Sequence, residues 1–244
     1  MPQKVLRSDF ATWAEYYSHY QSELARRFLI PFVESGGVSL EGLDLLDVGC
    51  GDGGATLEFA RRTGGRAVGL DIGDFPWVEA GPVEFRRADI LEEEVARSLA
   101  GQFDLVMLRD VIEHIPDKDL MFRHLKAALR GRGFVFVTFP PYYSAFGGHQ
   151  QAELTGSRLR YLPYMHAHPG LRHIARTRMT VAGFERLARR SGMAVRARRL
   201  FALRPSFELR YGLPTLGFAL PGLPGVREVL CTGAYYLLEW NGDD

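Results

Sequence analysis

The amino-acid sequence predicts one α/β domain whose open, mostly parallel sheet carries helices on both faces. Three observations support this fold class. Five β-prone segments alternate with helical segments between residues 43 and 139. The first of them is an apolar run that ends in glycines, as is typical of a parallel strand covered on both sides. The chain has 244 residues and is 46% hydrophobic, which is enough for a large core.

The first predicted element is a helix over residues 9–34. Its apolar residues recur at spacings of three and four, which places them on one face. They are Trp13, Tyr17, Tyr20, Leu24 and Phe28. Ser8 or Asp9 is expected to cap the start of this helix, and Gly36 and Gly37 are expected to end it.

A predicted strand, Leu43–Val48, leads into a turn with glycine at positions 49, 51, 53 and 54 and a helix from Ala55. Glycines there let the backbone approach a ligand, and the helix start presents free N–H groups. The glycine spacing fits a dinucleotide fingerprint, with Asp71 at the expected distance. However, Asp47 would repel a pyrophosphate, and its carboxylate suits a ligand with an amino group better.

The segment Asp47-Val48-Gly49-Cys50-Gly51-Asp52-Gly53 resembles motif I, (D/E)-x-G-x-G-x-G, of the class I S-adenosylmethionine-dependent methyltransferases. Their cofactor carries a sulfonium and an α-amino group but no phosphate. The resemblance is to the small-molecule, methyltransferase-11-like type, and it covers residues 43–139 well and the C-terminal strands loosely. It implies a Rossmann-like sheet of seven strands, mostly parallel, with the last strand antiparallel.

The remaining predicted elements follow in order along the chain. Helices are expected over residues 55–63, 92–100, 117–130 and 180–192, and strands over residues 66–72, 83–87, 103–108, 134–139, 194–203 and 234–240. The helix at 180–192 begins at Thr180 and ends at Gly192, which are good capping residues. We treat residues 1–244 as a single domain.

Aspartates end the first three predicted strands, and ligands bind at the carboxyl ends of strands in such sheets. By resemblance, Asp47, Asp71 and Asp89 match the amino-acid, ribose and adenine parts of the cofactor. Residues 1–37 pack on the sheet edge or, as in the resembling enzymes, close over the cofactor as a lid. The implied cofactor-binding set is Asp47, Gly49, Cys50, Gly51, Asp71, Ile72, Asp89, Ile90, Arg109 and Tyr17.

The segment after the fourth strand, residues 109–117, resembles the V-x-E-H-x-x-D pattern of the same family. Glu113 and His114 either contact the substrate and relay a proton, or form a hydrogen-bonding pair that fixes the loop. We expect Arg109 to lie near the cofactor and to contact it through its backbone.

Residues 140–178 are interpreted as a cap insertion after the fifth strand, because Pro140 and Pro141 exclude a helix there. His149 is the candidate general base, or it only ties the cap together. Candidate substrate-binding residues are Tyr142, Tyr143, His166 and His168. A single His-x-His pattern without nearby cysteine is weak, so we expect no metal.

Residues 205–230 are apolar but interrupted by proline and glycine, so they cannot span a bilayer as a helix. Three roles stay open for this region: it covers the substrate site, it forms a homodimer contact, or it admits a hydrophobic substrate. The net charge of +1 gives no case for nucleic acid. The two cysteines and the absence of an apolar signal region lead us to expect a cytoplasmic protein without stable membrane insertion.

These patterns lead to one functional hypothesis and two alternatives. The first is methyl transfer from S-adenosyl-L-methionine, leaving S-adenosyl-L-homocysteine, to an O, N or C nucleophile of a small molecule such as a natural product or hydrophobic metabolite. The alternatives are an NAD(P)-dependent oxidoreductase, favoured by the glycine spacing alone, and a non-catalytic protein that binds S-adenosylmethionine.

Overall fold

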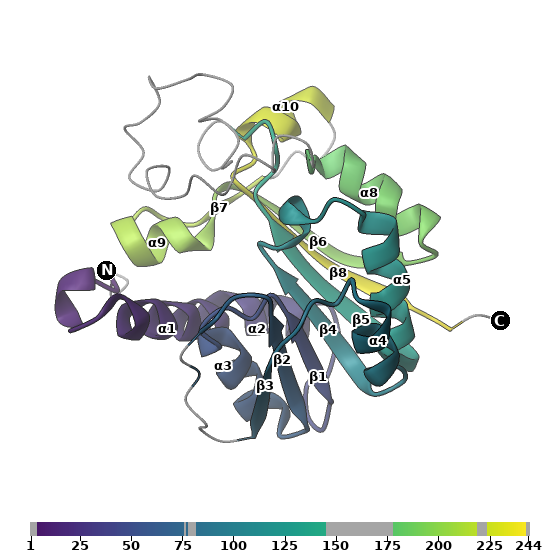
Figure 1. The fold of residues 1–244 in the computed structure, drawn as a ribbon. Helices are drawn as coiled ribbons and strands as arrows, with labels where there is room; N and C mark the ends of the chain where they lie inside the picture. Colours follow the sequence, from purple (N-terminus) through teal and green to yellow (C-terminus); the bar gives the residue numbers. More distant parts are fainter. Residues whose placement is uncertain (1–3, 76, 78–81, 145–177, 219–223, 243–244) are drawn as a thin grey trace.

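The computed structural model describes residues 4–75, 77, 82–144, 178–218 and 224–242, and these form one sheet covered by helices (Figure 1). The sheet has eight strands in the order β3-β2-β1-β4-β5-β8-β6-β7. They are β1 (Leu45–Val48), β2 (Ala67–Asp71), β3 (Val83–Arg87), β4 (Phe103–Arg109), β5 (Leu129–Phe139), β6 (Ala194–Leu203), β7 (Leu216–Gly217) and β8 (Gly233–Trp240).

The helices take the labels of Figure 1. They are α1 (Trp13–Leu24), α2 (Ile30–Ser35), α3 (Gly54–Thr63), α4 (Glu93–Ser98), α5 (Lys118–Ala128), α8 (Val181–Arg190), α9 (Pro205–Tyr211) and α10 (Pro224–Leu230). Two short 3₁₀ turns, Arg7–Asp9 and Ile112–His114, and a π-helical segment, Ala25–Leu29, complete the regular structure of the described residues.

The strand order reverses beside β1, and this reversal positions the site. β1 pairs in parallel with β2 on one side and with β4 on the other. The chain therefore builds β1, β2 and β3 outward in one direction and then returns to add β4 and β5. In open α/β sheets such a switch point leaves a crevice at the carboxyl ends of the two central strands.

Two apolar cores lie on opposite faces of the sheet. One is formed with α1, α2 and α3 and includes Tyr20, Leu24 and Phe59. The other is formed with α4, α5 and α8 and includes Phe122 and Phe184. Figure 1 shows these two groups of helices on either side of the strands. Both faces of β1 and β4 are thus covered, as their continuous apolar sequences predicted.

The expected seven strands become eight in the structure. The additional strand is β7, two residues that pair antiparallel with β6 inside the apolar region 205–230. Proline and glycine keep this strand short, because they limit the run of ladder hydrogen bonds on either side. The antiparallel C-terminal strand is confirmed: β8 lies between β5 and β6 and runs antiparallel to both.

The N-terminal helix differs from its prediction. It begins at Trp13 rather than at residue 9, because Thr12 caps it and forms a capping box with Glu15. Trp13 is 65% exposed and Tyr17 is half-buried, whereas Tyr20 and Leu24 are buried as expected, together with Tyr16. The π-helical segment shifts the register further, so that Leu29 rather than Phe28 is fully buried.

Two further observations concern the chain as a whole. Within the described ranges, no helix combines the length and apolar character that crossing a bilayer requires. The expected cap comprises residues 140–178. Of these, residues 145–177 lie outside the part of the chain that the structure describes.

Candidate functional site

A cavity of about 820 Å³ opens at the carboxyl ends of the central strands. Four parts of the chain contribute most of its described lining: the glycine loop after β1, the end of β4, one face of α1, and α9 with the start of β8. Lining residues used below are Tyr17, Tyr20, Gln21, Cys50, Gly51, Asp52, Arg109, Asp110, His114, Arg204, Ser206, Arg210 and Tyr235.

The glycine loop has a backbone that only glycine adopts easily. Gly49, Gly51 and Gly53 all have positive φ, at 75°, 57° and 82°. A Cβ at Gly49 would overlap the side chain of Val111, so β1 and the segment after β4 can approach closely only with glycine there. The loop therefore lies against the end of β4 and exposes its own backbone to the cavity.

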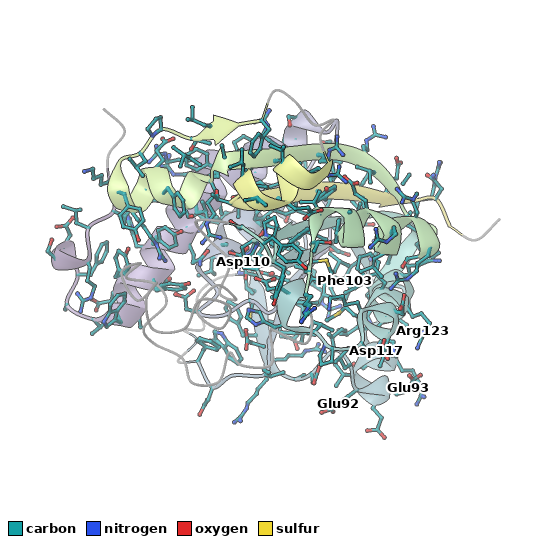
Figure 2. The ribbon with its side chains drawn as sticks, turned by 90° about the horizontal axis from the view of Figure 1, so that it is seen from above. Glu92, Glu93, Phe103, Asp110, Asp117 and Arg123 are labelled. Atoms are coloured by element: carbon teal, nitrogen blue, oxygen red, sulfur yellow. The ribbon has the colours of Figure 1, made fainter. Side chains whose placement is uncertain are left out.

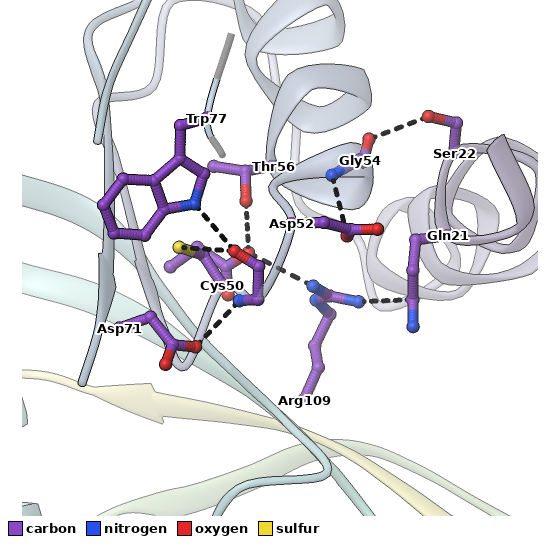
Figure 3. Close-up of polar contacts among 11 residues, drawn as sticks. Gln21, Ser22, Cys50, Asp52, Gly54, Thr56, Asp71, Trp77 and Arg109 are labelled. Carbon is purple, nitrogen blue, oxygen red and sulfur yellow. Dashed lines mark hydrogen bonds and ion pairs between the residues drawn. The ribbon is translucent and has the colours of Figure 1, made fainter. Parts of the chain in front are cut away.

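Asp71 fixes the glycine loop from the neighbouring strand (Figure 3). Its carboxylate accepts a hydrogen bond from the Gly51 N–H at 2.9 Å and another from the Gly73 N–H at 2.8 Å. On the other side, the Trp77 indole N–H donates to the Gly51 carbonyl at 2.7 Å. The acid that ends β2 thus sits directly beside the loop that ends β1.

Asp47 and Arg109 form a buried charge pair behind the cavity (Figure 3). Asp47 is fully buried, and its Oδ2 accepts hydrogen bonds from the Thr56 hydroxyl at 2.6 Å and from Arg109 at 3.4 Å. Arg109 also donates to the Gln21 side chain at 3.0 Å. Burial is the largest single influence and lowers the pKa of the guanidinium, but Asp47 and Asp110, with smaller contributions from Cys50 and Asp52, together raise it.

Asp47 and Arg109 therefore differ in their access to the cavity. Arg109 lines it with a side chain that is 8% exposed, whereas Asp47 does not line it. Asp47 Oδ1 and Arg109 Nε have no hydrogen-bond partner among the described residues. Because Asp47 holds Arg109 in place, the Arg109 guanidinium presents a fixed positive charge to a ligand in the cavity.

Asp52 supplies a negative charge at the same end of the cavity, and Figure 3 shows it beside Arg109. Burial raises the pKa of its carboxyl group. One oxygen accepts from the Gly54 N–H at 3.5 Å, and the other, Oδ2, is buried without a partner among the described residues. A cationic group beside it would satisfy this oxygen and lower the cost of its charge.

Four more of the expected cofactor residues are not among those that line the cavity: Asp71, Ile72, Asp89 and Ile90. Asp89 follows β3 and accepts a hydrogen bond from the Leu91 N–H. Ile90 is buried, and its carbonyl accepts from His124 Nδ1 at 2.7 Å. Ile72 follows β2 and is 69% exposed, whereas Cys50 and Tyr17 line the cavity itself.

Asp110 is a cavity residue that the sequence analysis missed. It is one of two described residues other than glycine with a positive φ, 54°. Its N–H donates to the Thr138 carbonyl, and the Thr138 hydroxyl donates to its carboxylate at 3.2 Å. Figure 2 shows Asp110 near the middle of the view, away from Glu93 and Arg123 on the α4–α5 side, and its side chain is 51% exposed. A strained backbone held by its neighbours is a common feature of functional sites. The signal was available, because Asp110 directly follows the fourth strand.

Glu113 and His114 occupy different environments although they are adjacent. Glu113 is fully buried, and burial together with Asp110 raises the pKa of its carboxyl well above the ordinary value. His114 lines the cavity, with Nε2 3.8 Å from the Glu113 carboxyl. Of the two, His114 alone can reach a bound molecule.

The expected substrate residues are placed only in part. Tyr142 is buried and packs edge-on against Tyr143, and neither is among the residues that line the cavity. His149, His166 and His168 lie outside the described residues. The cavity instead has a second set of polar residues at α9 and β8, which the sequence analysis did not single out.

Comparison with known proteins gives consistent matches. A family described as a methyltransferase domain matches residues 16–198. A ubiquinone biosynthesis O-methyltransferase of Acinetobacter baylyi is 26% identical over 149 residues, which cover 56% of this chain and 61% of that protein. The enzyme of the same name from Bordetella avium is 35% identical over 108 residues, 41% of this chain and 44% of that protein. The matched segments thus span about half the length of these relatives.

The fold has solved counterparts. The crystal structure of a SAM-dependent methyltransferase from Archaeoglobus fulgidus superposes with a TM-score of 0.57 at 15% identity, covering 96% of this chain and 97% of that one. This likeness confirms the expected Rossmann-like architecture. Because the family match extends over most of the chain, from α1 into β6, the protein belongs to the methyltransferase domain family.

Proposed function

We propose that this protein transfers a methyl group from S-adenosyl-L-methionine to an oxygen, nitrogen or carbon nucleophile of a small molecule. One observation carries the proposal. At the glycine-loop end of the cavity, Arg109 and Asp52 provide a positive and a negative group, each with a buried atom that lacks a hydrogen-bond partner among the described residues. A free amino acid has the complementary pair of charges, and the amino-acid part of this cofactor is such a zwitterion.

The chain's own residues fit that part of the cofactor. Arg109 is suited to the carboxylate, because a guanidinium is a strong and directional partner for it. Asp52 is suited to the ammonium group. Asp47, expected to bind the ammonium itself, is proposed to hold Arg109 in place from behind.

The nucleoside part is assigned to the adjacent strand ends. Asp71 is proposed to bind the ribose hydroxyls and Asp89 the adenine amino group, with Ile72 and Ile90 as apolar walls. Gly49, Cys50 and Gly51 supply backbone along the cavity. The fixed position of Asp71, against Gly51 and Gly73, supports this assignment because an oriented carboxylate can accept two hydroxyl hydrogen bonds.

The reaction needs orientation more than acid–base chemistry. The bound cofactor supplies an electrophilic methyl group on a sulfonium centre. The protein holds the acceptor in line and excludes water, and Tyr17 and the rest of α1 contribute to that enclosure. His114 is the described cavity residue best suited to take a proton from a hydroxyl or ammonium acceptor, with Glu113 positioning it. His149 remains proposed as a base within the cap.

Two alternatives are weaker on this geometry. An NAD(P)-dependent oxidoreductase would place a pyrophosphate at the glycine loop, where Asp47 and Asp52 both add negative charge. A non-catalytic protein that binds S-adenosylmethionine would keep the same cofactor residues but would not transfer the methyl group to any acceptor.

Binding of S-adenosylhomocysteine, measured by calorimetry, tests the proposal. We expect it to bind, NADH not to bind, and Asp71→Ala to weaken binding at least tenfold, about 1.4 kcal/mol. Arg97→Gln is the matched control, because Arg97 is exposed on the surface of α4 and, in the part of the chain that the structure describes, forms an ion pair with Glu93 alone. Binding of NADH without S-adenosylhomocysteine would exclude the methyltransferase.

We also propose a cytoplasmic setting and a small-molecule acceptor. Both described cysteines, Cys50 and Cys231, are free and buried, which suits a reducing compartment. A homodimer through residues 205–230 is supported by exposed apolar side chains there, Leu213, Leu216, Val226, Val229 and Leu230. Light scattering of the purified protein tests that part.

A further inference from the structure

The α9 end of the cavity carries polar groups for which the cofactor has no use. Arg204, Ser206 and Arg210 all line the cavity, and they come from α9 and the residue before it. The groups assigned to the amino-acid part of the cofactor lie instead on the glycine loop and β4. The α9 groups therefore belong to the part of the cavity available to the acceptor.

Arg204 is held in a fixed position. Its side chain is 12% exposed and lies 3.8 Å from the Asp110 carboxylate, measured from Nη1 to Oδ2. Gly233 at the start of β8 makes room for it, since a Cβ there would come within 3.0 Å of the Arg204 Cβ. The Phe207 ring lies 5.5 Å from the guanidinium carbon. A guanidinium packed on several sides loses little further freedom when it binds a ligand.

Arg210 and Ser206 extend the same polar surface. The guanidinium carbon of Arg210 lies 4.3 Å from the centre of the Tyr20 ring and 5.8 Å from that of Tyr17. Arginine combines such stacking with bidentate recognition of carboxylate and phosphate. Ser206 is 7% exposed, and its hydroxyl has no hydrogen-bond partner among the described residues.

The charge balance favours an anion at this end. Asp52 and Asp110 are the acidic residues in the described lining; the former belongs to the glycine loop and the latter faces Arg204. Glu208, on the same helix as Arg210, does not line the cavity. Its carboxylate is engaged by Arg27 at 2.9 Å and by the Thr215 hydroxyl at 2.7 Å. The acidic group on α9 is thereby kept away from the ligand.

We propose that the methyl acceptor is an anion whose oxyanion, a carboxylate or a phosphate, binds to Arg204, Ser206 and Arg210. The rings of Tyr20 and Tyr235, which also line the cavity, contact its body. This proposal rests on the proposed function and names its substrate class. It predicts that the acceptor enters with its charged group toward α9 and its nucleophile toward Asp110 and His114.

Equilibrium binding of simple anions tests the proposal directly. Benzoate, phenyl phosphate and benzamide are titrated by saturation-transfer NMR into the full chain, with and without saturating S-adenosylhomocysteine. We expect one or both anions to bind at least tenfold more tightly than benzamide and more weakly at high salt. The order of benzoate and phenyl phosphate identifies the carboxylate or the phosphate as the preferred oxyanion.

Anion binding by substituted proteins tests which residues form the anion site. Arg210→Gln and Arg204→Gln are each expected to weaken anion binding at least tenfold and Ser206→Ala about threefold. Arg210→Lys keeps the charge and is expected to recover part of the affinity. Arg97→Gln is the surface control. Affinity for S-adenosylhomocysteine, measured on the same samples, reports whether each variant is folded.

The proposal is overturned if benzamide binds as well as both anions, if neither anion binds, or if Arg210→Gln leaves their binding unchanged. Failure of the proposed function has another signature, the loss of S-adenosylhomocysteine binding by the unaltered protein. The two results are measured separately, so either proposal can fail alone.

Discussion

Glu113 is a carboxyl group whose pKa the fold raises. It is fully buried, and burial and the nearby Asp110 both raise its pKa well above its ordinary value of 4.5. A protonated carboxyl can donate a hydrogen bond, so the raised pKa extends the pH range over which Glu113 can orient its surroundings as a donor. That property fits a residue that positions His114.

The raised pKa of Glu113 predicts a pH-dependent stability. Above pH 4.5 the unfolded chain loses this proton while the folded chain keeps it, so the stability due to Glu113 falls as pH rises toward its folded pKa. Glu113→Gln removes the titration. Its stability relative to the unaltered protein should rise with pH, by up to about 1.4 kcal/mol per pH unit over that interval. Urea unfolding at pH 4.5, 6.0 and 7.5 measures this.

The control for this experiment is Glu94→Gln on the exposed side of α4. Its stability difference from the unaltered protein should stay constant across the same pH values. A constant difference for Glu113→Gln as well would mean that Glu113 does not titrate abnormally.

Single residues show which parts of the site were predictable. Asp71 and Asp89 were singled out because Asp71 ends β2 and Asp89 follows β3, and strand ends meet at one edge of a parallel sheet. The Asp47–Arg109 pair joins residues on two strands, and a single sequence contains no record of that distance. Arg204 and Arg210 could not be foreseen, because only the docking of α9 brings them to the cavity.

At the scale of elements, α1 and α3 cross closely at Gly54. A Cβ on Gly54 would overlap the Ser18 carbonyl oxygen of α1, and the Ser22 hydroxyl donates to the Gly54 carbonyl at 3.0 Å. Gly54 is therefore needed for helix packing. Its match to the third glycine of a dinucleotide fingerprint is explained by this contact rather than by a pyrophosphate.

Gly54→Ala tests the importance of this crossing. The added methyl group should force α1 away from α3 and cost about 1–3 kcal/mol of stability. Because α1 lines the cavity, affinity for S-adenosylhomocysteine should fall at least fivefold. Calorimetry and urea unfolding provide the two measurements.

Thr12→Ala is the matched variant on the same helix. It removes the N-cap of α1, which is worth about 1 kcal/mol, without touching the crossing. We expect a similar loss of stability with a smaller loss of affinity. Equal losses of affinity in the two variants would show that general loosening of α1, and not the crossing, determines binding.

Elements were predictable where local signals agreed with tertiary packing. β3, β6 and the Thr180-capped α8 match their expected limits closely. In α8 the cap at Thr180 and the buried apolar face agree. The N-terminal helix was predicted too long. Its three-to-four spacing continues through a π-helical segment, and that insertion changes the buried face without leaving a sequence signal.

At the scale of the whole molecule, the cavity joins parts from both halves of the chain. α1, the glycine loop and β4 meet α9 and β8 around one space. A ligand that fills this space contacts all of these elements at once. Ligand binding should therefore stabilise the entire fold and not only the site.

This coupling predicts a measurable thermal shift. At a concentration one hundred times its Kd, S-adenosylhomocysteine should add about 2.7 kcal/mol to the free energy of unfolding, which raises Tm by several degrees. Asp71→Ala should need a correspondingly higher concentration for the same shift. Scanning calorimetry over a series of concentrations checks both, and a Tm that does not depend on ligand concentration would contradict them.

The position of β8 bears on how the protein is made. Among the described strands β8 comes last in the chain, yet it lies between β5 and β6 and pairs with both along most of its length. Strands β1 to β5 can assemble in order while synthesis continues, since each strand after β1 pairs with an earlier one. β6 pairs with the two-residue β7 but is not joined to that nascent sheet until β8 emerges. During that interval the edges of β5 and β6 that later pair with β8 are unpaired. A chaperone that binds exposed strand edges is expected to act on the chain at this stage.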